Sequence, residues 1–279
     1  MTGVQTCALP IFLIATDSIR ALLHQRLLLG LMLASLALTI FFSITMSSAR
    51  KNITKSFTDD QMATNSFMGT NQMSEVDRHK FRESMENAST TLQAMFYQVA
   101  SFGGSIVALF IFSTAVASEI RKGTIRLTLS KPVSRAQFLL GKYLGGVVVM
   151  AAFALLASLA ILLFAQTQNL ELSPVIKWAP WLMFCRQLML GSLAMLLSLF
   201  MHPIIASVLA FVAGNGFYSP PNPLYFVLPS YKDFNVFFQV LQGSLLNLKD
   251  VACLSLYAAD FVAIILLLAL WRFRTKELV

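Results

Sequence analysis

Long uncharged apolar segments constrain the fold of this chain more than any other feature. A membrane-spanning helix needs about 20 predominantly apolar residues to cross the hydrocarbon layer. Met95–Ala117 and Tyr143–Ala165 are longer than this and contain no Asp, Glu, Lys or Arg. Leu27–Met46 is a third such segment, and Ala252–Trp271 is a fourth, interrupted only by Asp260. We therefore expect an all-α integral membrane protein.

The composition agrees with a chain that lies mostly in lipid. Hydrophobic residues make up 57% of the 279 residues and charged residues 12%, which is about half of the charged fraction usual in soluble domains. The mean hydropathy is +0.70. We expect a lipid bilayer as the surrounding medium and no nucleic-acid partner.

A fifth apolar segment, Trp181–Phe217, is too long for one span. His202-Pro203 interrupts it, and proline lacks the N–H that a helix interior requires. We therefore predict two spans here, at about 182–201 and 203–217, which makes six in all.

The charge distribution predicts the orientation of these six spans. The N-terminal segment, the link at 118–142 and the C-terminal tail share one side and carry net charges of +1, +5 and +2, which together equal the net charge of the chain, +8. The opposite loops, 47–94, 166–181 and 218–251, are each neutral. Because short cytoplasmic loops are enriched in Lys and Arg, we expect both termini and the link to be cytoplasmic.

The N-terminal residues fall into two parts. Met1–Ile11 resembles a translated sequencing adapter and is set aside, so the predicted domain comprises residues 12–279 as a single six-helix unit. Phe12–Arg26 is predicted to be a helix at the inner interface. Its apolar face carries Ile19, Leu22 and Leu23.

Two outer segments are distinctive. The loop 47–94 is long and polar, and its second half, Glu75–Leu92, is expected to be helical. The segment 218–251 contains four prolines among phenylalanines. Such a segment suits the outer interface or a partial dip into it, where protein must cover its backbone.

Sequence motifs for catalysis are absent from the chain. Gly141-Lys142 is followed by Tyr143 and lacks the earlier glycine of the phosphate-binding pattern Gly-x-x-x-x-Gly-Lys-Ser/Thr. The patterns Gly-x-Ser-x-Gly and His-Glu-x-x-His do not occur either. We therefore expect no enzyme activity, and no cofactor bound by this chain itself.

Metal and disulfide chemistry have little support. The three histidines, His24, His79 and His202, fall on different parts of the predicted topology, so no metal site is expected. Apart from the set-aside segment, the cysteines are Cys185 and Cys253. They are interpreted as small buried hydrophobic residues, with a bridge between them as the alternative.

Charged residues inside spans are costly and suggest a functional site. Asp260 lies near the middle of the last span and Arg186 near the outer end of the fourth. One interpretation is an Asp–Arg pair between helices, or a polar point on a substrate path. The other is that Arg186 extends to the interface beside Trp178 and Trp181, while Asp260 meets a hydroxyl or backbone partner.

The link at 118–142 combines several features. Six basic residues accompany one acidic residue, Glu119. Glu119 and Gly123 flank a turn of helix at the end of a span, and Pro132 stops the next piece of chain. Ser134 is placed to cap a second helix that leads into the third span.

The order of residues in the link carries a family resemblance. Glu-x-x-x-Gly-Thr-Ile-x-x-x-Leu-Ser-Lys-Pro-Val-Ser-Arg-x-x-Phe-Leu-x-Gly-Lys resembles the first cytoplasmic loop of ABC-2-type exporter permeases. It is most similar to the branch that includes the NosY-like permeases. The resemblance implies an ABC-2-type exporter transmembrane domain with a cytoplasmic coupling helix, in the bacterial inner membrane.

The same resemblance implies partners and roles. The subunit would dimerise, with a second copy or a paralogous permease, and would bind a separate cytoplasmic ATPase that holds ATP and Mg. The coupling and ATPase-docking residues would be Glu119, Arg121, Lys122, Gly123, Thr124, Arg126, Lys131, Pro132 and Arg135. Two other classes of function stay open from the residues alone: an intramembrane enzyme using Asp260 or His202, and a channel.

Overall fold

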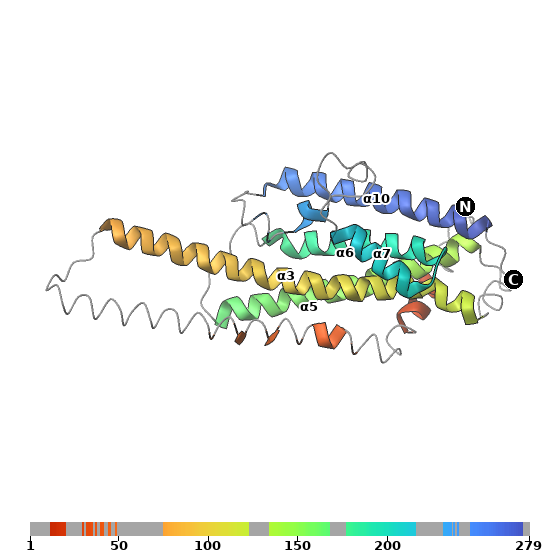
Figure 1. Ribbon diagram of the computed structural model, residues 1–279, viewed down its shortest axis with the longest axis horizontal. Coiled ribbons are helices and arrows are strands. Elements are labelled where there is room, and N and C mark those ends of the chain that lie inside the picture. The colour runs from red at the N-terminus through yellow and green to blue at the C-terminus, as the bar shows by residue number, and fades with distance from the viewer. Residues whose placement is uncertain are drawn as a thin grey trace, which may run out of the picture.

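The computed structural model describes residues 12–20, 75–122, 134–167, 177–215, 231–235 and 246–275, with scattered helical positions between 30 and 48 and residues 237 and 239 (Figure 1). All regular structure in these ranges is helical. The first expected span, 27–46, is described only at scattered helical positions, which make up half of its residues, and Met1–Ile11 and 49–74 lie wholly outside the described residues.

The described part is a bundle of apolar helices around a central one. Its elements are α3 (Glu75–Lys122), α5 (Arg135–Thr167), α6 (Ala179–Ser198), α7 (Pro203–Asn215), the short 3-10 helix η2 (Tyr231–Phe234) and α10 (Leu248–Thr275). Four of these, α3, α5, α6 and α10, are long and apolar enough to cross a membrane, and α7 is a shorter apolar helix. Helix α6 contacts all the other four (Figure 1).

Helix α3 extends well beyond its apolar part. The span within it is Gln93–Ile120, whereas the helix begins at Glu75 and runs for 48 residues. At 1.5 Å per residue, the polar part adds about 27 Å, and it projects past the other labelled helices in Figure 1. The expected helix in the second half of the loop is present, and it is continuous with the second span.

The break between α6 and α7 confirms the prediction from His202-Pro203. Helix α6 ends at Ser198 and α7 begins at Pro203. The N–H of Phe200 donates to the carbonyl of Leu197 at 3.0 Å, so the last turn tightens before the chain reverses. The segment therefore forms two helices, but α7, with 13 residues, is shorter than the helices that are long enough to cross a membrane, so a sixth span stays a prediction.

Glycines allow α3, α5 and α6 to approach closely around Phe112, which is fully buried. A Cβ added at Gly191 would lie 2.1 Å from Cδ2 of the Phe112 ring, and one at Gly146 would lie 2.6 Å from its Cε1. The ring centroid of Tyr143 is 5.0 Å from that of Phe112. The ring therefore occupies space that side chains at both glycines would need.

We expect Gly191→Ala to lower the midpoint of thermal unfolding of the purified protein in detergent. Overpacking of a filled core costs about 1–3 kcal/mol, which exceeds the gain of up to about 1 kcal/mol in helix propensity. Gly30→Ala is the matched control, because nothing lies within 4 Å of a Cβ at Gly30. Equal midpoints for the two variants would contradict this packing.

The N-terminal helix packs on α5 through one face. Residues 12–20 are helical, with Ala15 and Ser18 buried. A Cβ at Gly145 would lie 2.8 Å from the Cβ of Ser18, so a glycine on α5 permits this contact. Ile19 packs against the core, as its place on the predicted apolar face requires. Leu22 and Leu23 lie outside the described residues.

The described part of the segment 218–251 reaches into the bundle. Tyr231 and Phe234 of η2 are 4% and 2% exposed and belong to the same core cluster as Leu190 of α6. The ring of Phe234 also stacks on Tyr257 of α10, with centroids 6.3 Å apart. This geometry agrees with a segment that dips between the spans, where the helices cover it.

Candidate functional site

The two ends of the 118–142 link lie at the same end of the bundle. Residues 123–133, which include five of the expected docking residues, lie outside the described residues. The side chains of Arg121 and Lys122 do too, although both residues belong to α3. The described part of the site is therefore the end of α3 and the first two turns of α5.

An ion pair joins the two ends of the link. The ammonium of Lys142 on α5 contacts the carboxylate Oε1 of Glu119 on α3, and both side chains are mostly buried. Lys142 Nζ also lies 5.7 Å from the ring centroid of Phe138. The end of α3 and the second turn of α5 are thus fixed to each other.

Ser134 caps α5 as the sequence predicted. The N–H of Gln137 donates to Ser134 Oγ at 3.2 Å, and the N–H of Ser134 donates to Gln137 Oε1 at 2.9 Å. This reciprocal pair is a capping box. It fixes the first residue of α5 as Arg135.

Arg135 contacts the far end of the chain. Its Nη1 donates to the carbonyl of Phe273 at 3.3 Å and to that of Arg274 at 3.0 Å. Both carbonyls lie in the last turn of α10, where helical acceptors have no partner within the helix and a cation is favoured. The rings of Phe138 and Phe273 stack beside this contact, with centroids 6.0 Å apart. Sequence reasoning missed this contact entirely.

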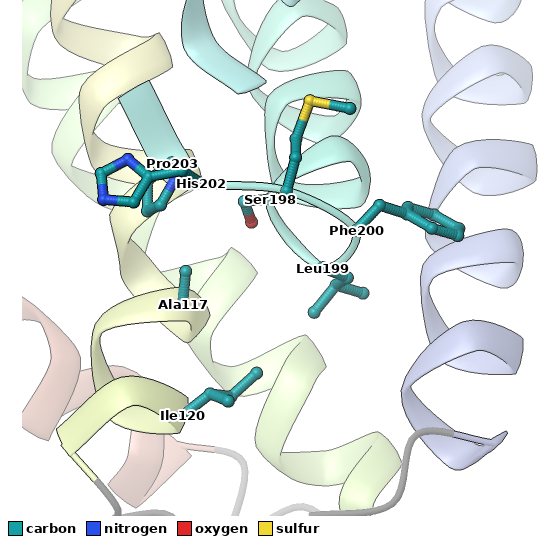
Figure 2. Close-up of a pocket in the computed structure, with 8 residues that line it drawn as sticks. Ala117, Ile120, Ser198, Leu199, Phe200, His202 and Pro203 are labelled. Carbon is teal, nitrogen blue, oxygen red and sulfur yellow. The ribbon is translucent and has the colours of Figure 1, made fainter. Parts of the chain in front are cut away.

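A pocket of about 320 Å³ lies next to this region, between the end of α3 and the turn that joins α6 to α7 (Figure 2). Ala117 and Ile120 line it from α3. In Figure 2 the ring of Phe200 points from the turn toward α10, and the guanidinium of Arg272 lies 4.9 Å from the centroid of that ring. His202, also on the pocket lining, accepts a hydrogen bond from the N–H of Ile204 at 3.4 Å.

Arg186 is buried inside the bundle, so the interpretation that it extends to the interface is wrong. Its residue is 5% exposed, and its Nη1 donates to Ser101 Oγ of α3 at 3.0 Å. Trp181 is half exposed and donates its Nε1–H to Ser255 Oγ of α10 at 2.8 Å. Arg186 lies on the face of α6 that meets α3, where its guanidinium has a hydroxyl partner.

Asp260 lies on the opposite side of α10 from the bundle. The buried residues of α10 form one stripe, which includes Ala258, Ile265 and Ala269. At 100° per residue, Asp260 is about 200° around the helix from Ala258, and it is exposed. The structure therefore does not bring Asp260 and Arg186 together as an ion pair.

The two cysteines differ in their surroundings. Both are free thiols; Cys185 is buried and Cys253 is exposed. The interpretation as a buried hydrophobic residue is confirmed for Cys185 and wrong for Cys253. In the part of the chain that the structure describes, no three His, Cys, Asp or Glu side chains gather into a group that could hold a metal ion.

Comparison with known proteins identifies the family. Residues 12–217 match the family model described as ABC-2 family transporter protein, and this match covers more than half of the chain. No curated protein shows significant similarity to the chain. Together with the apolar helical bundle, the match identifies the chain as a member of the ABC-2 transporter family, a multi-pass membrane permease of an ABC transporter.

Proposed function

We propose that this chain is the transmembrane subunit of an ABC-2-type exporter and that a separate cytoplasmic ATPase drives it. The observation that supports this proposal best is the ion pair between Glu119 and Lys142, which joins the two ends of the link. The chain between them carries an excess of basic residues and no phosphate-binding motif. A partner that binds ATP would dock on this basic loop.

The mechanism follows from the position of the link between two spans. ATP and Mg would be held by the ATPase, whose closure would displace the loop between α3 and α5. Because Glu119 and Lys142 are paired, the ends of both helices would move together. The spans would then change from inward to outward access. Arg121, Lys122 and Arg126 would supply charge for docking.

The assembly and location belong to the same proposal. A second permease, either a copy of this chain or a paralogue, would complete the transmembrane unit in the bacterial inner membrane, with both termini cytoplasmic. The order of residues in the link favours the NosY-like branch of exporters. The neutral outer loops and basic inner segments support the orientation.

Reversing the charges of Arg121 and Lys122 to glutamate tests the docking role. We expect the doubly reversed variant to bind the ATPase at least about tenfold more weakly, because rim charges of opposite sign guide association and like charges oppose it. The measurement is the dissociation constant of the purified permease and its co-expressed ABC ATPase. The thermal unfolding midpoint should stay near that of the parent.

The matched control is reversal of Arg78 and Lys80, two basic residues at the other end of the same helix. This control changes the net charge of the chain by the same amount. Because its residues lie at the other end of α3 from the link, it should leave ATPase binding intact. Normal binding by the Arg121 and Lys122 variant would show that these residues do not dock the ATPase. Failure of the parent chain to bind an ABC ATPase would overturn the proposed function itself.

A further inference from the structure

Helix α10 is attached to the bundle by a narrow stripe of side chains. Its buried residues are Val251, Ala258, Ile265, Ala269 and Phe273, and most of its other apolar side chains are partly or fully exposed. Only Phe273 is a large side chain that is fully buried. Helix α10 packs mainly on α6, and at its inner end Phe273 also stacks on Phe138 at the start of α5.

The contact with Arg135 acts on the backbone of α10. Arg135 donates to the main-chain carbonyls of residues 273 and 274, so it holds the helix regardless of the side chains at those positions. Helix α10 has 28 residues and contains neither proline nor glycine. Since sharp bends need such residues or an inserted group, a displacement of its last turn moves the whole helix.

The other side of the contact leads directly to the link. Arg135 is the first residue of α5, and the Ser134 capping box fixes it there. Arg135 is therefore only two residues from position 133 of the link. A second contact, between Arg272 and Phe200, ties the same turn of α10 to the turn between α6 and α7.

We infer that Arg135 is a positioning residue of the transport cycle, one that carries movement of the link to α10. This inference rests on the proposed function and assigns Arg135 a role different from ATPase docking. Its guanidinium holds the end of the last span, and movement delivered there shifts Asp260 and the outer end of the helix. The stack of Phe138 on Phe273 keeps the two helix ends in register.

Cys253 reports the position of the outer end of α10. It is exposed, whereas Cys185 is buried. Close by, Ser255 accepts a hydrogen bond from Trp181, and Tyr257 stacks on Phe234. A shift of α10 relative to these neighbours changes the access to Cys253. Its alkylation rate therefore measures movement about 30 Å from Arg135, the rise over some 20 helical residues.

The experiment uses the permease–ATPase complex in lipid nanodiscs, in a Cys7→Ser background. The alkylation rate of Cys253 by a soluble maleimide is compared without nucleotide and with ATP plus vanadate. We expect the parent rate to change at least threefold. Arg135→Met, which has no donor for the carbonyls, should leave ATPase binding normal and should abolish this change. Arg135→Lys, which keeps a donor for the carbonyls, should restore part of it.

Arg274→Gln is the matched control, because it removes a basic side chain but keeps the carbonyl that accepts from Arg135. It should respond to nucleotide as the parent does. A parent-like response in Arg135→Met would show that Arg135 does not transmit movement to α10 and would overturn the inference. Loss of ATPase binding in that variant would make Arg135 a docking residue and would overturn the inference as well. The inference would also be contradicted if the parent complex forms but nucleotide does not change its alkylation rate at Cys253. If the parent chain forms no complex with an ATPase, the proposed function itself would be overturned.

Discussion

Replacing Asp260 by leucine is expected to abolish nucleotide-driven transport while leaving the isolated chain at least as stable as the parent. Asp260 lies near the middle of α10 and is exposed on the side away from the bundle. A charge at that depth costs about 2.5–3.5 kcal/mol on insertion scales. Leucine removes this cost, and the structure gives Asp260 no hydrogen bond or ion pair with a described residue that the substitution would break.

A membrane protein keeps a charged residue at this free-energy cost when the charge has a function in the assembled complex. Asp260→Asn keeps the shape and the hydrogen-bonding capacity but removes the charge. If the charge is what matters, Asn should impair transport nearly as much as Leu. We expect both variants to assemble with the ATPase and to keep its basal ATP hydrolysis, since Asp260 is remote from the link.

The measurements are the thermal unfolding midpoint, ATPase binding and substrate-dependent ATP hydrolysis in nanodiscs. Ile264→Leu is the matched control, because Ile264 is exposed one turn along the same face of α10. Transport at the parent rate by Asp260→Leu would exclude a role for the carboxylate. A marked fall in the midpoint would mean instead that Asp260 stabilises the single chain.

Breaking the pair between Glu119 and Lys142 is expected to produce the largest loss of stability among the variants considered. Lys142→Met takes away the cation that Lys142 supplies to a mostly buried carboxylate and removes the contact with Phe138. Loss of one partner of a buried pair typically costs 3–5 kcal/mol, and about half of that is reasonable here because both side chains keep some contact with water. The link at 118–142 would also lose the contact that joins its two ends.

The exchanged variant, Glu119→Lys with Lys142→Glu, separates pairing from other effects. It keeps opposite charges at the two positions, so it should recover a large part of the lost unfolding midpoint. A double-mutant cycle on thermal unfolding and on ATPase binding measures the coupling between the two residues. Additive effects of the two single substitutions would show that the pair does not tie the helix ends together.

Local features of the fold were predictable from the sequence. Pro203 predicted the break between α6 and α7, and the capping role of Ser134 followed from its position between Pro132 and the helix that leads into the third span. Each of these features depends on a hydrogen bond between residues at most a few positions apart. Apolar length alone placed α3, α5, α6 and α10, because lipid leaves few alternatives to a helix.

Contacts between distant helices were not predictable in this way. Arg135 bonds to carbonyls some 138 residues away, and every residue offers a carbonyl, so the acceptors leave no trace in the sequence. Arg186 was misinterpreted because nearby tryptophans indicate depth in the membrane but not which face of a helix meets its neighbour. The expected pair of Asp260 with Arg186 failed for the same reason, because the sequence does not show that the packed stripe of α10 runs through Ala258 and Ala269.

The length of α3 means that one rigid helix connects the link to the far end of the bundle. One uninterrupted helix of 48 residues is about 72 Å long, and it ends at the link on one side and stands clear of the bundle on the other. A tilt of about 5° about its inner end would move its outer tip by about 6 Å, by the geometry of a rod of that length. Any tilt about the link end of α3 would therefore produce its largest displacement at the far end of the polar part of the helix.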